Sequence, residues 1–312
     1  MTDLAAELSL LLGPGVRVED LERLSGGASR QTSSFTAVDA DGGRRALVVQ
    51  QARPGAGSTG LDMGTQAALV RAAGAGGVPV AGVVATSDDG TAVVLDRVEG
   101  ETIARRILRD DAFSGARSRL AAQCGEALAA LHAIPVDAVS GLESPDQLAQ
   151  YREVLDLLGR ASPAFELGFR WLDARRPEPG RTTVVHGDFR NGNFVIGPDG
   201  LRAVLDWELA HLGDPLEDLA WVCVKSWRFA AAPRVGGFGE VDDLVGAYEA
   251  ASGTTVDRAA LHWWEVLGTL KWGIMCGMQA AAHLSGASRS VELAAIGRRV
   301  CEVEHDLLLL LA

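Results

Sequence analysis

A polar loop flanked by short apolar segments constrains the fold of this chain more strongly than its other sequence features. Residues 186–193 read HGDFRNGN, and the apolar segments on either side have the composition of short β-strands. A third apolar segment follows, and Asp206 stands at its end, 13 residues after Asn193. Polar residues held between strands commonly form a functional site, because rigid elements position the loop. We therefore expect Asp188, Asn193 and Asp206 to lie close together.

These three residues have the chemistry that phosphoryl transfer requires. The reaction needs a carboxylate that orients an attacking hydroxyl and accepts its proton, and oxygen ligands that hold magnesium against phosphate groups. Two carboxylates and one amide supply that set. Each residue taken alone is equally consistent with a turn former or a helix cap, so the prediction depends on the spacing of the whole set.

A hydrolytic metal centre is an alternative interpretation of the same loop. In that case His186 and Asp188 would be metal ligands. Such a site normally needs further convergent histidines, and the spacing of the remaining histidines does not suggest ligand pairs. These are His132, His211, His262, His283 and His305.

The rest of the chain divides into a strand-rich part and a helical part. Residues 16–98 contain short apolar runs separated by turn signals, and one helix is expected among them over about residues 61–73. Beyond Glu101 the apolar residues recur at helical spacing. The predicted fold is therefore α+β, with two lobes at 1–98 and 99–312 and a hinge at about 95–101.

The sequence HGDFRNGN followed by LDWE resembles the aminoglycoside phosphotransferase family, whose members are distant relatives of protein kinases. The resemblance implies a two-lobed protein-kinase-like fold, with a small antiparallel sheet and one helix in the first lobe and a larger, mostly helical second lobe. It also implies that ATP, or another nucleoside triphosphate, and Mg²⁺ are the cofactors. Within the motif, Asp188 would be the catalytic base and Arg190 a catalytic residue near the γ-phosphate. Asn193 and Asp206 would be the magnesium ligands.

Two further residues acquire structural roles from the resemblance. His186 would pack beneath the loop. Asp214, in the segment GDPLEDLA at residues 213–220, would cap a helix and brace the catalytic loop. A proline follows Asp214 and is typical of the first turn of a helix, which supports the capping role.

A glycine-rich segment, SGGAS at residues 25–29, lies between two predicted strands. Backbone amides in such a loop can approach phosphate oxygens closely, because glycine has no side chain. On its own the segment is more typical of a plain turn. Its position ahead of the HGDFRNGN loop, and its similarity to the same segment in family members, favour a nucleotide-binding loop made by Gly26, Gly27, Ala28 and Ser29.

The resemblance also implies an ion pair that this sequence does not contain. Family members carry a cation on the third strand, which contacts nucleotide phosphates, and a glutamate on the following helix. Here the aligned residues are Gln50 and Gln66. Two amides can still hydrogen-bond to each other and avoid leaving one buried charge unpaired. Both glutamines are therefore predicted to belong to the nucleotide site.

This replacement has two interpretations. In the first, Arg30, Arg53 or Arg190 supplies the missing positive charge and the enzyme is active. In the second, the chain is a degraded kinase that binds a nucleotide or another ligand without turnover. The complete set of transfer residues favours the first interpretation.

The acceptor is predicted mainly from resemblance. Segments 98–110 and 188–221 look closest to the kinase domains fused to acyl-CoA dehydrogenases and to their free-standing bacterial relatives. That resemblance implies phosphorylation of a hydroxyl group on a small molecule of the hydroxyacyl type. An aminoglycoside is the alternative, since a formal net charge of −12 suits a cationic substrate. Four tryptophans could line the acceptor pocket or belong to the core, namely Trp207, Trp263, Trp264 and Trp272.

The composition indicates which classes of partner and which cellular compartment to expect. The basic residues are scattered, so no footprint of a nucleic-acid partner is visible. No apolar run reaches membrane-spanning length, and residues 1–12 have the pattern of a short amphipathic helix rather than of a secretory signal. The four cysteines are widely spaced, without a metal-binding CxxC pair, and are expected to be reduced core thiols. We expect a cytoplasmic protein with a hydroxylated small-molecule substrate, and the sequence does not predict its oligomeric state.

Overall fold

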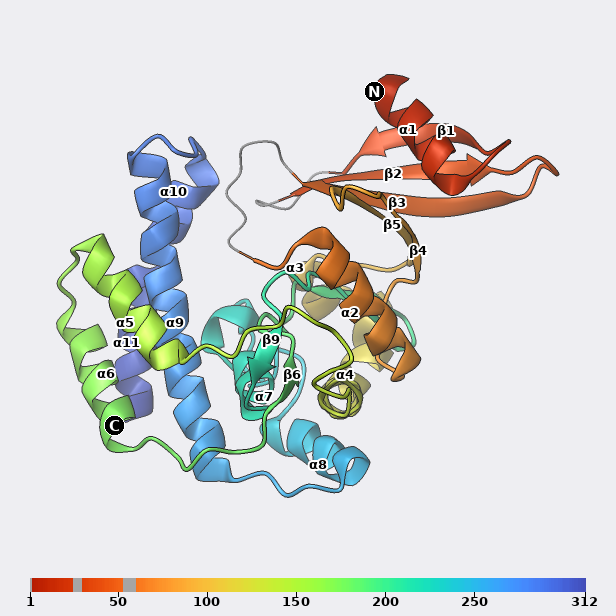
Figure 1. Cartoon of the computed structure of the whole chain (residues 1–312). Helices are drawn as coiled ribbons and strands as arrows, with labels where there is room; N and C mark the ends of the chain where they lie inside the picture. The colour runs from red at the N-terminus through yellow and green to blue at the C-terminus, as the bar shows by residue number, and fades with distance from the viewer. Residues whose placement is uncertain (1, 25–29, 53–59) are drawn as a thin grey trace.

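The structure is a computed structural model that describes residues 2–24, 30–52 and 60–312. Its N-terminal part contains a five-stranded antiparallel sheet with the strand order β1-β2-β3-β5-β4. α1 (Thr2–Leu12) covers one face of this sheet and α2 (Met63–Ala75) lies against the other, as Figure 1 shows. The strands are β1 (Arg17–Arg23), β2 (Arg30–Val38), β3 (Arg44–Ala52), β4 (Val83–Thr86) and β5 (Ala92–Asp96).

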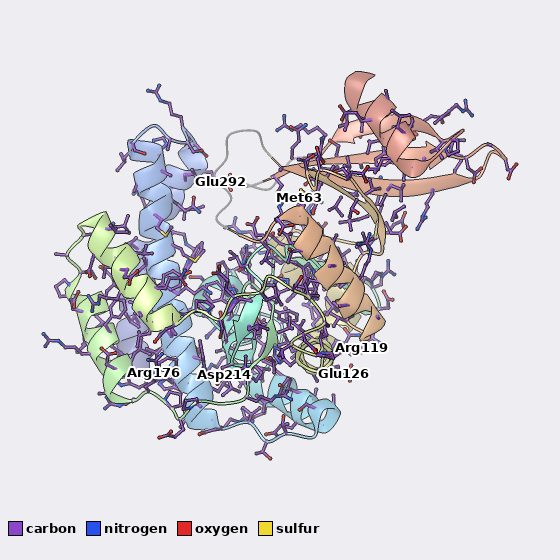
Figure 2. All side chains as sticks on the ribbon, in the orientation of Figure 1. Met63, Arg119, Glu126, Arg176, Asp214 and Glu292 are labelled. Atoms are coloured by element: carbon purple, nitrogen blue, oxygen red, sulfur yellow. The ribbon has the colours of Figure 1, made fainter. Side chains whose placement is uncertain are left out.

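The alternation of side chains along the strands explains why both faces of the sheet carry a helix. Phe35 and Leu47 stand opposite each other on β2 and β3 and pack with Leu8 of α1. On the other face, Val93 of β5 packs with Met63, which lies at the end of α2 nearest the sheet in Figure 2. Burying an aliphatic side chain of this size contributes roughly 1.5–3 kcal/mol. The two apolar faces therefore fix both helices on the sheet.

The helix predicted over about 61–73 is present, with its ends shifted by two residues. It begins at Met63 because the side chain of Asp62 accepts a hydrogen bond of 2.9 Å from the backbone nitrogen of Thr65. A side chain that caps the first free amides in this way sets the start of a helix. Gly76 and the left-handed Gly77 (φ 91°) follow its last residue, Ala75.

The C-terminal part is mostly helical, which confirms the predicted α+β class. α4 and α8 pack against each other, and the long helix α9 contacts α5, α6, α7, α10 and α11. The α-helices are α3 (Ala104–Arg109), α4 (Ser114–His132), α5 (Gln147–Leu158), α6 (Pro163–Ala174), α7 (Leu216–Trp221), α8 (Val241–Ser252), α9 (Arg258–Leu284), α10 (Val291–Gly297) and α11 (Val300–Leu311). Short 3₁₀ helices occupy Asp111–Phe113 and Lys225–Arg228.

Two small antiparallel ribbons interrupt the helices where the sequence predicts short strands. β6 (Thr183–Val185) pairs with β9 (His211–Gly213), and β7 (Phe194–Gly197) pairs with β8 (Gly200–Val204). All three residues of β6 and all four of β7 are buried. The polar loop 186–193 therefore enters and leaves through buried strands, which hold it in place.

The cysteines are free thiols, as expected, but they are not all in the core. Cys124, Cys223 and Cys276 are buried, whereas Cys301 on α11 is exposed. The prediction of a core position for Cys301 was wrong, because the apolar pattern of α11 places Val300, Val303 and Leu307 inward instead.

Within residues 2–24, 30–52 and 60–312, the helices are all too short or too polar to cross a membrane.

Candidate active site

The backbone of the loop between β6 and β7 begins with a conformation that requires glycine. Gly187 has φ of 77°, and a Cβ atom at this position would clash with the carbonyl oxygen of Leu209. A positive φ is easily adopted only without a side chain. Gly187 thus lets the chain turn sharply after the buried strand β6 and present Asp188 at the start of the loop.

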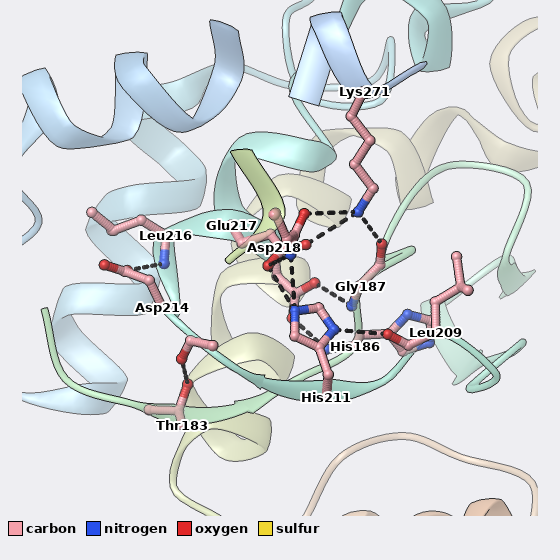
Figure 3. A network of polar contacts seen from close by, with 12 residues as sticks. Thr183, His186, Gly187, Leu209, His211, Asp214, Leu216, Glu217, Asp218 and Lys271 are labelled. Atoms are coloured by element: carbon pink, nitrogen blue, oxygen red, sulfur yellow. Dashed lines mark hydrogen bonds and ion pairs between the residues drawn. The ribbon is translucent and has the colours of Figure 1, made fainter. Parts of the chain in front are cut away.

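Asp218 on α7 holds this turn. Its carboxylate accepts hydrogen bonds from the backbone nitrogens of His186 (2.7 Å) and Gly187 (2.9 Å), and it is fully buried. Figure 3 shows these contacts beneath the loop. Asp218 therefore braces the catalytic loop, and the prediction that Asp214 does so was wrong. Asp214 instead accepts from the backbone nitrogen of Leu216 (2.9 Å) at the start of α7, because it lies at the helix end rather than on the face toward the loop.

His186 is buried beneath the loop, against the ring of Trp207 at 4.7 Å between centroids. Burial lowers the pKa of its ring, so the neutral form is favoured. Its Nε2 lies 3.0 Å from the carbonyl oxygen of Leu205, and its Nδ1 accepts from the backbone nitrogen of Asp188 at 3.2 Å. One donor and one acceptor match a neutral imidazole. His186 consequently ties the loop to the segment that carries Asp206.

The carboxylate of Asp188 is oriented by three side-chain donors. Its Oδ1 accepts from Nε of Arg190 (2.9 Å) and from the indole nitrogen of Trp221 (2.8 Å). Its Oδ2 accepts from Nδ2 of Asn193 (2.6 Å). Two donors occupy Oδ1 and one occupies Oδ2, so Oδ2 keeps an acceptor position for a further proton.

Asp206 lies next to this loop, as its spacing predicts. The backbone nitrogen of Leu205 donates to the carbonyl oxygen of Asn193 at 2.8 Å, which brings the two segments together. Asp206 has φ of 65°, an uncommon conformation for a residue with a side chain. Desolvation by the surrounding protein and the neighbouring carboxylates of Glu208 and Asp188 together raise the pKa of its carboxyl to about 6, against the opposing effect of Arg30 and Arg190.

This donor set fits a small divalent cation. Desolvation and two nearby carboxylates make the surroundings of Asp206 unfavourable for its own charge, and a cation would reverse that effect. Both hydrogen bonds of Asn193 use its amide nitrogen, so the amide oxygen is the atom available to a cation. The part of the chain that the structure describes contains no cluster of three or more His, Cys, Asp or Glu residues suited to a metal. A Mg²⁺ site with few protein ligands, completed by waters and phosphate oxygens, agrees with this finding.

A pocket between the sheet, α2 and Asp206 contains the residues predicted to contact the nucleotide. Gln50, Gln66 and Arg30 line it together with Asp206. Gln66 does not bond to Gln50 as the sequence suggested. Its Oε1 accepts from Nη1 of Arg30 and its Nε2 donates to the carbonyl oxygen of Leu61 (2.5 Å). The predicted loop of Gly26, Gly27, Ala28 and Ser29 lies outside the described residues, as does Arg53.

A cluster of tryptophans adjoins Asp188 and Arg190. The ring of Trp221 lies 5.2 Å from that of Trp227, which lies 4.6 Å from that of Trp272. The guanidinium of Arg190 lies over Trp227 at 4.4 Å. Of the four tryptophans considered from the sequence, Trp272 therefore belongs to this cluster. Trp207 packs beneath the loop, and Trp263 is a core residue whose indole donates to the carbonyl oxygen of Leu172, with Trp264 against its ring.

A buried network of charged side chains supports the loop from below. Nζ of Lys271 on α9 lies 3.2 Å from Oε1 of Glu217 and 3.4 Å from the carbonyl oxygen of Gly187 (Figure 3). Gln147 also bonds to Glu217 and Lys271. Burial opposes the charge of Glu217, but Lys271 and His211 outweigh it and lower its pKa to about 2. The ion pair is therefore charged in the folded protein.

The ring of His211 completes this network. Its Nε2 lies 3.0 Å from Oε2 of Glu217 and its Nδ1 lies 2.8 Å from the carbonyl oxygen of Leu209. Burial opposes protonation, but the Glu217 carboxylate and these hydrogen bonds outweigh it, so the pKa of His211 is raised. An acceptor lies at each ring nitrogen, which suits a protonated imidazole, and the side-chain nitrogen of Gln147 also lies 2.9 Å from Nε2.

Comparison with known families agrees with this geometry. The model of the phosphotransferase enzyme family, APH, matches residues 20–264, which include most of the sheet, the loop 186–193 and Asp206. This chain belongs to that family. Membership favours the phosphotransferase interpretation of the loop over the hydrolytic metal centre.

A protein from mouse matches part of this chain in sequence. Acyl-CoA dehydrogenase family member 10 of Mus musculus is 29% identical over 188 residues, which make up 56% of this chain and 18% of that protein. The chain therefore spans less than a fifth of the length of this relative.

Solved structures match over nearly the whole chain. A putative aminoglycoside phosphotransferase from Ralstonia eutropha has a TM-score of 0.74 at 20% identity and covers 100% of this chain and 98% of its own. A spectinomycin phosphotransferase solved with ADP and spectinomycin has a TM-score of 0.66 at 12% identity, with 97% of each chain covered. At these identities the likeness shows that the fold is shared.

Four residues of the site were not predicted from the sequence: Glu208, Asp218, Trp221 and Lys271. Glu208 lies in the motif LDWE and Asp218 in the segment GDPLEDLA. Both segments resemble the family, and this resemblance could have identified the two residues as part of the site. Lys271 had a different signal, since it stands among apolar residues in a chain with one other lysine, Lys225. A buried lysine needs a partner, but the sequence alone does not say which one.

Proposed function

We propose that this protein is a magnesium- and ATP-dependent kinase that phosphorylates a hydroxyl group of a small molecule. The observation that carries the proposal is Asp188, whose carboxylate is oriented by three donors and lies near the Asp206 carboxylate. Family membership supports a phosphotransferase, and the spectinomycin phosphotransferase of the same fold was solved with ADP.

In this proposal Asp188 is the catalytic base. The acceptor oxygen attacks the γ-phosphorus, the bond from that phosphorus to the ADP oxygen breaks, and the hydroxyl proton passes to Oδ2 of Asp188. Trp221 and Arg190 hold Oδ1, so the carboxylate keeps one orientation during the transfer. In this proposal the N–H groups of Arg190 that do not bond to Asp188 would donate to the transferred phosphoryl group.

Asn193 and Asp206 would hold Mg²⁺. When bound, the ion neutralises phosphate charge and fixes the nucleotide oxygens. The chain's own contribution is to place one amide oxygen and one carboxylate beside Asp188.

We also propose that residues 1–98 and 99–312 act as two lobes, with the hinge at about 95–101. The N-terminal sheet and α2 would cover the nucleotide, and the helical part would hold the acceptor. The backbone nitrogen of Glu101 donates to the carbonyl oxygen of Ile196 (2.9 Å), which attaches the end of the hinge to β7.

The surroundings of Asp188 favour a hydroxyacyl acceptor over an aminoglycoside. Trp221, Trp227 and Trp272 form an apolar aromatic cluster beside Asp188, and the cation of Arg190 is stacked on it. The name of the mouse relative, an acyl-CoA dehydrogenase family member, also supports an acyl compound.

The proposal is tested by measuring ADP release with hydroxyacyl-CoA thioesters, free hydroxy acids and aminoglycosides, with and without Mg²⁺. We expect Mg²⁺-dependent release with a hydroxyacyl compound. Asp188→Asn should lower kcat by about 100-fold or more, because the proton acceptor is lost. Asp199→Asn is the matched control, since Asp199 is exposed in the turn between β7 and β8 and bonds to Arg202. Its kcat should equal that of the wild type.

Three results would contradict parts of the proposal. Release with aminoglycosides alone would reject the acyl acceptor. Equal activity of Asp188→Asn and wild type would reject the base. Nucleotide binding without turnover for any acceptor would support the degraded-kinase interpretation instead.

A further inference from the structure

The third strand of the sheet offers no cation to the nucleotide pocket. Gln50 stands opposite Val93 in the register of β3 and β5, and Val93 packs with Met63 of α2. Gln50 therefore faces α2 and the pocket, where the resemblance predicts a positive charge. Its amide is neutral, so a phosphate-binding cation must come from another element.

The register of β2 and β3 places Arg30 on the same face. Arg30 pairs with Ala52 and Thr32 pairs with Gln50, and residues two apart on a strand point to the same side. Arg30 is thus the diagonal neighbour of Gln50, at a separation that a long side chain bridges easily. Both side chains line the pocket that contains Asp206.

The contacts of Arg30 hold its guanidinium in that pocket. Nη1 donates to Oε1 of Gln66, and Nη2 lies 3.4 Å from Oε2 of Glu208. The Arg30 side chain is 13% exposed, so the ion pair is shielded from most of the solvent. A guanidinium has five N–H donors, and these two contacts leave others for a ligand.

The replacement of the helix glutamate by Gln66 follows from this arrangement. Glu208 already supplies a carboxylate to Arg30, and Asp206 lies close by. A glutamate at position 66 would add a third carboxylate around one guanidinium. Gln66 provides the hydrogen-bond acceptor without the extra negative charge.

The other two candidate cations fit the role less well. Arg190 is engaged by Asp188 and lies over Trp227. Arg53 lies outside the described residues.

We propose that Arg30, presented by β2, supplies the phosphate-binding cation of the nucleotide site, with Glu208 as its counter-ion and Gln66 as a neutral support. The proposal rests on the proposed kinase function. Its physical basis is that a guanidinium can bond to two supports and to phosphate oxygens at once, which a lysine ammonium does less well. The phosphate-binding cation is therefore carried by β2 instead of β3, and the neutral Gln50 does not imply a degraded enzyme.

The test compares dissociation constants of ADP and adenosine for wild type, Arg30→Gln and the double variant Arg30→Gln/Gln50→Lys. We expect Arg30→Gln to raise the Kd of ADP by about tenfold or more and that of adenosine by less than about twofold, since only ADP carries the phosphates. The double variant returns a cation to β3 and should recover most of the ADP affinity. Arg44→Gln is the matched control, because Arg44 is exposed on β3 and pairs with Glu19 and Asp20. It should bind both ligands as the wild type does.

The outcomes separate this proposal from the proposed function. Wild-type protein that binds neither ADP nor ATP would reject the nucleotide site itself. Wild-type binding that Arg30→Gln leaves unchanged would reject the role of Arg30 alone. An equal loss for ADP and adenosine would show that Arg30 only maintains the fold of the pocket, and would also overturn the proposal. If Arg30→Gln does not fold, Arg30→Lys replaces it in the test. We then expect a smaller rise in the Kd of ADP, and an unchanged Kd would overturn the role of Arg30.

Discussion

At the scale of single residues, Gly187 and Asp206 are among the positions of the site whose backbone adopts a conformation that most side chains avoid. Gly187 has φ of 77° and Asp206 has φ of 65°. The first costs little because glycine lacks a Cβ atom. The second stores a local strain of order 1 kcal/mol, which persists because the surrounding structure holds the backbone in place. Strain at a carboxylate beside a proposed catalytic base is typical of functional positions.

Gly187→Ala should disrupt the loop at this scale. The new Cβ atom would meet the carbonyl oxygen of Leu209, and the amide of residue 187 would shift from Asp218. We expect a loss of about 1–3 kcal/mol in the free energy of unfolding and a strong loss of kcat in the ADP-release assay.

Gly246→Ala provides the comparison for this substitution. Gly246 is exposed on α8, and a Cβ atom there meets no neighbour within 4 Å. Alanine should stabilise that helix by about 0.5–1 kcal/mol and leave kcat unchanged. Urea unfolding curves of the two variants and the wild type measure these free energies of unfolding. Equal stability of Gly187→Ala and wild type would contradict the proposed clash with the carbonyl oxygen of Leu209.

At the scale of elements, α9 connects the helical part of the chain to the catalytic loop. It runs for 27 residues and begins at a cap where Asp257 accepts from the backbone nitrogens of Ala259 and Ala260. Near its middle, Lys271 reaches Glu217 of α7 and the carbonyl oxygen of Gly187. The buried ion pair thereby fixes α9 to α7, and the hydrogen bond from Lys271 fixes α9 to a loop that is far away in sequence.

Lys271→Met should destabilise the protein by about 3–5 kcal/mol, because it leaves the Glu217 carboxylate buried without its main partner. Lys225→Met is the control, since Lys225 is 54% exposed and its pair with Asp306 is screened by water. Lys225→Met should lower the free energy of unfolding by only about 0–1 kcal/mol. Chemical denaturation measures both, and a small effect of Lys271→Met would show that the ion pair contributes little to the fold.

At the scale of the whole molecule, the negative net charge of −12 does not describe the buried network beneath the loop 186–193. There, Lys271 and His211 share the single carboxylate of Glu217. Surface charge therefore gives no guide to the acceptor. The expected cytoplasmic location and the absence of a nucleic-acid partner stay predictions.

His211 should make the global stability depend on pH. Its pKa is raised in the folded protein above the ordinary value of 6.5. A raised pKa means that the protonated ring stabilises the folded state, so the contribution is complete below pH 6.5 and is lost as pH rises through the folded pKa. We expect the free energy of unfolding of the wild type to fall over that window. Urea titrations from pH 6 to about pH 9 should show a shallower fall for His211→Gln, and identical slopes would contradict the assignment.

The sequence by itself determined the class of fold and the position of the polar loop 186–193 between short strands. Turn residues between apolar strands act locally, so the spacing of Asp188, Asn193 and Asp206 predicted that they meet. The helix start at Met63 was also nearly predicted, since a cap such as Asp62 works over one turn.

Only the tertiary structure decided which side chains support that loop and which cation enters the nucleotide pocket. Asp218 and Lys271 reach the loop from α7 and α9, and a single sequence does not record such distant contacts. The role of Arg30 depends on the strand register, which sets its face and its neighbours. A shift of one residue would turn Arg30 to the other face of the sheet, and local sequence patterns constrain that register only weakly where both faces are covered by helices.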